Sequence, residues 1–160
     1  MKNILLFLVA SVVIVSCTDN SQKIQELQTQ IDSLKLKIEN TYQPGFGEMM
    51  SNVQIHHAKL WFAGNDKNWP LADFEIHEIE ETLDDIKKYQ TDRVESKSID
   101  LMVPALNNME SAIDKKDLSV FKTNFQILTN TCNECHQTVK FGFNKVKIPT
   151  TPPFTNQDFH

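Results

Sequence analysis

Residues 132–136 read Cys-Asn-Glu-Cys-His, and this short segment constrains the chain more than any other. Two cysteines three residues apart, followed at once by histidine, are typical of a covalent c-type haem attachment site. The thiols of Cys132 and Cys135 can add across the two vinyl groups of a porphyrin, and the imidazole of His136 can then reach the iron from one face. The sequence therefore predicts one covalently bound haem c with His136 as the proximal iron ligand.

Other interpretations of the two cysteines are a thioredoxin-like redox pair, half of a zinc site, or two ordinary buried thiols. A thioredoxin-like pair lies in a βαβ context, and the sequence shows none. A structural zinc site takes four ligands, but the chain has only one further cysteine, Cys17. Five residues can also arise by chance, so these alternatives stay open, and haem attachment is the interpretation that the N-terminus favours.

The N-terminus has the features of a bacterial lipoprotein signal. After the basic residue Lys2, residues 4–15 form an apolar run that is too short for an ordinary membrane span. The run ends in Ile-Val-Ser-Cys, similar to a lipobox, whose cysteine is lipidated and becomes the first residue after cleavage. Residues 1–16 are therefore predicted to be a lipoprotein signal peptide and Cys17 the lipidation site. A plain signal peptide, with Cys17 there by chance, is the alternative.

This interpretation predicts an exported protein, anchored by lipid to a membrane on the periplasmic side or at the cell surface. The 160-residue chain has a formal charge of −5 and a single arginine, Arg93, which argues against a nucleic-acid partner. The acidic balance is compatible with a cationic redox partner protein. The chain has no nucleotide-binding loop and no acid–base pair at a recognisable spacing, so an enzyme is not expected.

Residues 17–44 are predicted to form the lipidated N-terminus and a helical stalk. Apolar residues alternate at steps of three and four over two heptads, as in a coiled-coil seam, at Ile24, Leu27, Ile31, Leu34 and Ile38. Two heptads are marginally stable alone. The 24–38 heptads therefore predict a homo-oligomer, or a helix that packs on the following domain.

Four further segments carry apolar residues at helical spacing, which predicts an all-α four-helix bundle over residues 45–140. Their seams are Phe46, Met50, Val53, His57, Leu60 and Gly64; Trp69, Ala72, Ile76, Ile79, Leu83 and Ile86; Ile99, Met102, Leu106, Met109 and Ile113; and Leu118, Phe121, Phe125, Leu128, Cys132, Cys135 and Val139. Both motif cysteines fall on the last seam. Residues 141–160 contain three prolines and are predicted to pack as an extended strap on the bundle.

One histidine, His57, falls within the apolar stripe of the first bundle helix. A histidine on a buried face is usually a core residue, but a bound iron would leave one axial position open. His57 is therefore the predicted distal iron ligand, with His56 and Met50 as alternatives. In the next helix His77 lies off the seam and is expected to be structural or exposed.

The second bundle helix also carries a run of acidic residues opposite its apolar seam, at Glu75, Glu78, Glu80, Glu81, Asp84 and Asp85. Such a run usually forms a solvated face. The alternative is a carboxylate metal site of the kind found in some helical bundles.

The attachment motif late in the last of four helices resembles the cytochrome c′ class of four-helix-bundle c-type cytochromes, here in a lipoprotein form. The resemblance covers about residues 46–140 and rests on Cys132, Cys135, His136 and the helical pattern. It implies that the first helix supplies the residue on the distal iron face, an apolar side chain or a methionine. A histidine there, and Asn133 with Glu134 instead of a basic residue beside the cysteines, depart from the family pattern.

Together these features predict a membrane-anchored mono-haem cytochrome that carries out one-electron transfer. One alternative is a protein that binds or senses a diatomic gas, NO or CO, at an open sixth iron position. Another is a non-redox lipoprotein adaptor in which the haem mainly stabilises a small core.

Overall fold

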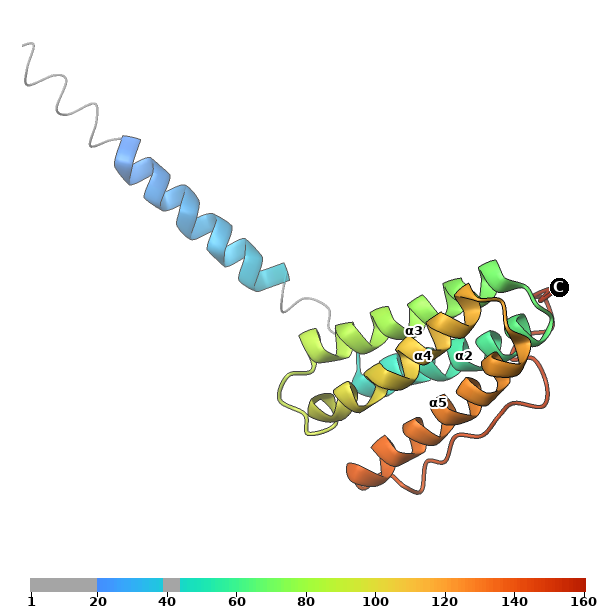
Figure 1. Cartoon of the computed structure of the whole chain (residues 1–160). Coiled ribbons are helices and arrows are strands. Elements are labelled where there is room, and N and C mark those ends of the chain that lie inside the picture. Colours follow the sequence, from blue (N-terminus) through green and yellow to red (C-terminus); the bar gives the residue numbers. More distant parts are fainter. Residues whose placement is uncertain (1–19, 39–43) are drawn as a thin grey trace, which may run out of the picture. The chain divides into compact units, whose positions relative to one another are not determined.

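The computed structural model describes residues 20–38 and 44–160, and the chain divides into two compact units, residues 1–43 and 44–160. All regular secondary structure in the described part is helical, which confirms the predicted all-α class (Figure 1). The predicted signal peptide and Cys17 lie outside the described residues. Among the helices that are described, none is both long and apolar enough to cross a membrane.

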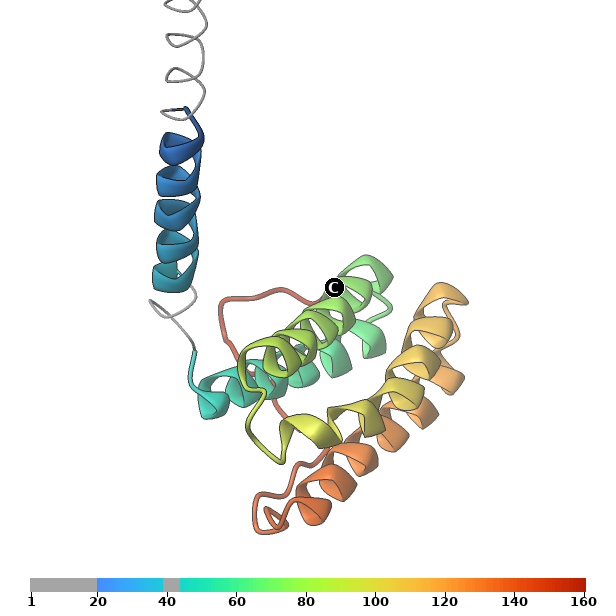
Figure 2. The same ribbon diagram turned by 90° about the vertical axis from the view of Figure 1, so that its left-hand side faces the viewer.

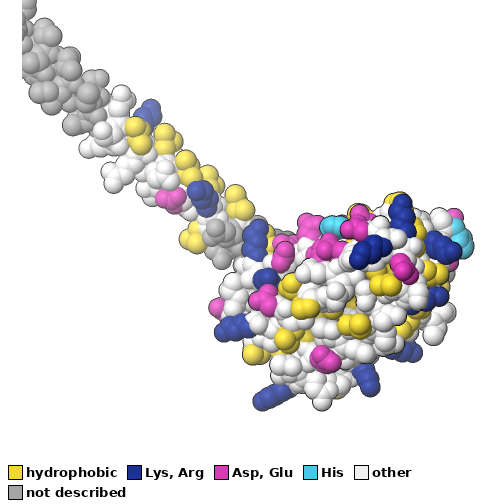
Figure 3. Space-filling model, in the orientation of Figure 1, with side chains coloured by type: hydrophobic (Ala, Val, Ile, Leu, Met, Phe, Trp, Pro, Cys, Tyr) yellow, Lys and Arg dark blue, Asp and Glu magenta, His cyan; other side chains and the backbone are white. Residues whose placement is uncertain are grey.

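In the first unit, residues 20–38 are helical. Every apolar residue of the predicted seam is exposed, from 46% at Ile31 to 74% at Ile38. Figure 3 shows hydrophobic side chains on the surface of this helix. Both predictions for this seam, self-association and packing on the domain, stay predictions.

The second unit begins with a helical hairpin of α2 (Phe46–Asn65) and α3 (Trp69–Tyr89). The side chain of Asn68 caps α3 by accepting a hydrogen bond from the backbone N–H of Leu71 at 3.3 Å. Pro70 occupies the first turn of α3, where its missing N–H costs nothing. These two signals end one helix and begin the next within a few residues.

The second hairpin consists of the 3₁₀ helix η1 (Ser96–Met102), α4 (Val103–Asp114) and α5 (Leu118–Thr138). The third seam predicts a helix in which Pro104 either causes a kink or lies near the start. The structure has the second arrangement, because the α-helix starts at Val103, with Pro104 in its first turn. Asp117 caps α5 by accepting hydrogen bonds from two backbone N–H groups, at 2.9 and 3.0 Å.

The two hairpins pack against each other as a helical bundle (Figure 2). Contact is more extensive within each hairpin than between them. At one crossing Gly64 of α2 meets the ring of Phe121 so closely that a Cβ atom at Gly64 would lie 2.0 Å from Cζ. Beyond α5 the chain has no helix or strand and returns along the bundle. It ends with Phe159 buried against Phe62, their ring centroids 5.7 Å apart.

Candidate functional site

The three residues of the predicted attachment motif line one hollow between the two hairpins. Cys132, Cys135 and His136 reach it from the last turns of α5. The opposite walls come from α2, α3 and η1 and are mainly apolar, with Met50, Val53, His57, Leu83, Ile99 and Met102. The structure thus brings the cysteines, the predicted proximal histidine and the predicted distal histidine to the same place.

Neither motif cysteine is in a disulfide. Cys135 is buried and Cys132 is half-buried. Burial, and secondarily the neighbouring Cys135, raises the pKa of the Cys132 thiol to about 12. Burial also raises the pKa of Cys135. Both thiols are therefore neutral and protonated at physiological pH, unlike a reactive thiolate pair.

His136 has one ring nitrogen engaged and one available. Its Nδ1 lies 2.6 Å from the backbone oxygen of Asn144, and a carbonyl can only accept, so Nδ1–H is the donor. The lone pair of the imidazole is then on Nε2. Metal-binding histidines almost always donate their other ring N–H to a carbonyl or carboxylate in this way.

Asn133, between the two cysteines, holds the loop that supplies this carbonyl. Its side-chain amide donates to the backbone oxygen of Val146 at 2.9 Å, and its side-chain oxygen accepts from the N–H of Val146 at 2.8 Å. Sequence reasoning missed both Asn133 and Asn144. No local pattern relates them, because their contacts join a helix to a loop 8 to 13 residues away.

His57 is buried and also has one ring nitrogen engaged. Its Nε2 lies 2.9 Å from the hydroxyl oxygen of Thr129. That hydroxyl donates its own proton to the carbonyl of Phe125, at 2.9 Å, so it accepts from His57 Nε2–H and leaves the lone pair on Nδ1. Burial lowers the pKa of His57 to about 4. The imidazole is therefore neutral at physiological pH and packs against the Phe125 ring, with centroids 4.5 Å apart.

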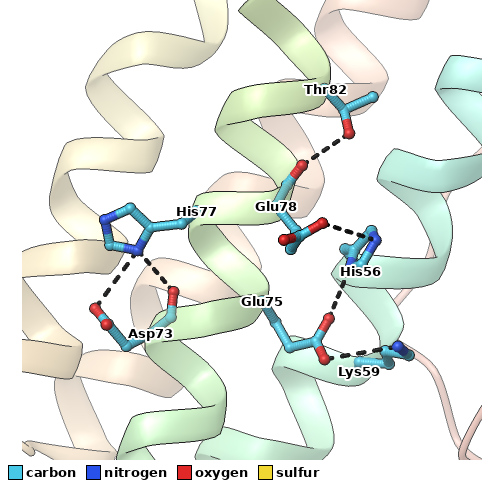
Figure 4. Close-up of polar contacts among 7 residues, drawn as sticks. All are labelled: His56, Lys59, Asp73, Glu75, His77, Glu78 and Thr82. Atoms are coloured by element: carbon cyan, nitrogen blue, oxygen red, sulfur yellow. Dashed lines mark hydrogen bonds and ion pairs between the residues drawn. The ribbon is translucent and has the colours of Figure 1, made fainter.

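The two alternative distal ligands lie in different places. Met50 lines the hollow together with His136. His56 does not line it and is directed to α3, where it contacts Glu75 and Glu78 (Figure 4). Met102 of η1 is a further thioether in the wall, which sequence reasoning treated only as a core residue.

The expectation that Glu75 belongs to a solvated face is wrong. Its side chain is completely buried, and its Oε2 lies 2.6 Å from Nδ1 of His56. Its Oε1 lies 3.7 Å from the Lys59 ammonium and makes no hydrogen bond among the described residues. Other acidic side chains do gather on the surface over α3 (Figure 3). Glu75 differs because its side chain faces α2, where His56 and Lys59 contact it.

One group of potential metal ligands lies outside the hollow, at His77, Glu80 and Glu110. His77 is exposed, as expected. A hydrogen bond to the backbone of Asp73, with nearby carboxylates, raises the pKa of His77. Burial and the neighbouring Glu110 raise the pKa of Glu80. The charges in this surface cluster compensate one another, and the cluster shares no residue with the hollow.

No protein-family model matches the chain, and no curated protein or solved structure is significantly similar to it. The assessment of the hollow therefore depends on its own geometry. The donor groups fit a covalent haem: two free thiols, and two imidazoles that each have one ring nitrogen in a hydrogen bond and the other available.

The hollow would have to widen to hold a porphyrin. The hollow has a volume of about 50 Å³, and an adjoining one beside Phe46 and Phe141 has about 170 Å³. Sites for cofactors commonly measure about 300–1,000 Å³. A porphyrin would therefore have to separate α2 of the first hairpin from α5 of the second. The hairpins are in less extensive contact with each other than within themselves, so this boundary is the part of the bundle that can widen with least loss.

Proposed function

We propose that the protein is an exported, lipid-anchored mono-haem cytochrome of cytochrome c′-like architecture that carries out one-electron transfer. The observation that carries the proposal is the meeting of two free thiols and two imidazoles in one mainly apolar hollow. A metal-free redox pair would not use the two imidazoles. A structural zinc site would need four ligand atoms close together, but among the described residues the group whose possible ligand atoms lie close together is His77, Glu80 and Glu110 and not the residues of the hollow. A covalent haem supplies an iron that cycles between ferric and ferrous states.

Each residue has a defined role in this proposal. Cys132 and Cys135 hold the porphyrin through thioether bonds, and His136 offers Nε2 to the iron while Asn144 fixes the orientation of the ring. His57 offers Nδ1 from the opposite wall, with Thr129 fixing its ring. Two imidazole ligands favour low-spin iron in both oxidation states, so little has to move when an electron is transferred.

The apolar pattern of the stalk favours self-association with a second stalk. Isoleucine occupies the first core position of each heptad and leucine the fourth, a combination that favours parallel two-stranded coiled coils. All five seam residues are exposed on the described helix. We therefore include in the proposal a parallel dimer of stalks, whose N-termini would lie side by side at the lipid anchor predicted at Cys17.

The distal ligand can be tested by optical and electron paramagnetic resonance spectra of the haem-loaded protein. Wild type should be low-spin in both oxidation states. His57→Ala should become high-spin, whereas Met50→Leu, in the same wall, should remain low-spin. Loss of the low-spin signal only in Met50→Leu would assign the sixth position to the thioether and would predict a higher reduction potential.

One observation favours diatomic gas binding as a second candidate. The Nε2 of His57 already has a hydrogen-bond partner in Thr129, and a ring that keeps this bond without approaching the iron would leave the sixth position open. High-spin ferrous wild type with fast carbon monoxide binding would support this candidate. Low-spin ferrous iron with slow binding would support electron transfer.

A further inference from the structure

The loop after α5 exposes two aromatic rings beside the candidate haem site. Phe143 is 82% exposed and Phe141 is 38% exposed, and their ring centroids are 5.5 Å apart. Phe141 also lines the wider hollow that contains Cys135 and His136. The pair of rings therefore extends from the wall of the site to the protein surface.

Hydrogen bonds hold the loop in the conformation that exposes the two rings. The backbone N–H of Phe141 donates to the carbonyl of His136 at 2.7 Å, and the N–H of Asn144 donates to the carbonyl of Phe141 at 2.8 Å. The two hydrogen bonds between Asn133 and Val146 close the far end of the loop. Removing large aromatic rings from water lowers the free energy, so a loop that holds two rings exposed favours contact with another surface.

The charge of the loop is opposite to that of the chain. Lys140, Lys145 and Lys147 are all exposed, and residues 136–157 contain no acidic residue. The whole chain, by contrast, has a formal charge of −5. Close to a surface the local charges dominate, because more distant ones are screened over about 8–10 Å at physiological salt. The aromatic–lysine loop, residues 140–147, is therefore a basic surface with an apolar centre.

We propose that the aromatic–lysine loop is the docking surface for an electron-transfer protein whose own docking face is acidic around an apolar centre. The inference rests on the proposed function and replaces the cationic partner expected from net charge. A protein docked here would lie next to the haem edge held by Cys135 and His136. One electron passes between the haem iron and the partner's redox centre, one being oxidised as the other is reduced, with no bond made or broken. If the loop instead bound a membrane, the bilayer would cover that haem edge.

The first test measures binding and needs no electron transfer. Two fluorescein-labelled acidic heptapeptides, one with a central leucine and one with a central serine, are titrated with the full-length protein and followed by anisotropy. Wild type should bind the leucine peptide about tenfold more tightly than the serine peptide, as expected for an aromatic anchor. Phe143→Ala should bind both equally. Equal binding of the two peptides by wild type would overturn the proposal.

The second test uses two small one-electron oxidants, anionic ferricyanide and cationic tris(phenanthroline)cobalt(III), with the reduced, haem-loaded protein. Oxidation by ferricyanide should slow as salt is added, because the lysines attract it. Replacing Lys140, Lys145 and Lys147 by glutamine should remove this dependence. The matched triple change at Lys115, Lys116 and Lys122, near the other end of α5, should leave it intact. If added salt instead slows oxidation by the cationic cobalt complex, the net negative charge of the protein controls the approach of the oxidant, and the inference fails.

A nitroxide on Phe143→Cys distinguishes a protein partner from a lipid surface. In phosphatidylglycerol vesicles the label should stay accessible to a water-soluble nickel chelate; burial in the bilayer would overturn the proposal. The binding test also separates this inference from the proposed function. A colourless protein refutes the haem, but the peptide titration still reports on the loop.

Discussion

The buried pair of His56 and Glu75 gives a quantitative prediction for stability. Glu75 has no exposed side-chain surface, and among the described residues its hydrogen-bond partner is His56, at 2.6 Å. His56→Leu would leave a buried carboxylate with only the Lys59 ammonium 3.7 Å away. Loss of one partner of a buried pair costs about 3–5 kcal/mol. This is a large share of the about 5–15 kcal/mol that stabilises a typical domain.

The double variant His56→Leu with Glu75→Leu should recover most of this loss, because two packed apolar side chains often replace a buried ion pair without cost. Urea unfolding at neutral pH, followed by far-ultraviolet circular dichroism, provides the measurement. With a denaturant dependence of about 1–3 kcal/mol per molar, His56→Leu should lower the midpoint by at least about 1 M.

His77→Leu is the matched control, because His77 is 59% exposed beside Asp73 and Glu110. An exposed pair contributes less than about 1 kcal/mol. The reasoning is refuted if His56→Leu costs no more than His77→Leu. It is also refuted if the two single costs at His56 and Glu75 simply add in the double variant.

Three further predictions concern other parts of the chain. Gly64→Ala should cost about 1–3 kcal/mol of stability, because its Cβ would lie 2.0 Å from the Phe121 ring on α5. Gly47→Ala is the control in the same helix: its Cβ meets nothing within 4 Å, so this change should be neutral or stabilising. The midpoints of urea unfolding measure both effects. Leu34→Cys should form a self-disulfide between stalks on mild oxidation and Thr29→Cys, on the opposite helix face, should not; equal yields would contradict a parallel seam. In the haem-free protein, the unfolded chain protonates His57 below about pH 6.5 but the folded chain only near pH 4. The free energy of unfolding should therefore fall by about 2 kcal/mol from pH 7 to 5, and His57→Gln should remove that fall; urea unfolding at the two pH values measures it.

The helices could be predicted from sequence because their seams are long and regular. The pattern from Leu118 to Val139 places both cysteines on one face, and α5 follows it closely, over Leu118–Thr138. The caps at Asn68 and Asp117 are likewise local signals. The start of the third helix was predicted less exactly, because Pro104 is compatible with either a kink or a helix start, and only packing decides between them.

The supporting contacts of the site could not be predicted, because they depend on tertiary geometry. Asn144 meets His136 only after the chain turns back from α5, and Thr129 meets His57 across the two hairpins. Glu75 was misplaced for a related reason: a position at the edge of a seam is buried or exposed according to what the facing helix offers. Here α2 offers His56 and Lys59.

The most direct test of the central claim is the intact mass and visible spectrum of the full chain, produced in cells able to mature c-type cytochromes and purified under denaturing conditions. The protein should keep its colour, carry the added mass of one haem, and show no alkylatable thiol at Cys132 or Cys135. A colourless chain in which reagents modify both thiols would contradict the account.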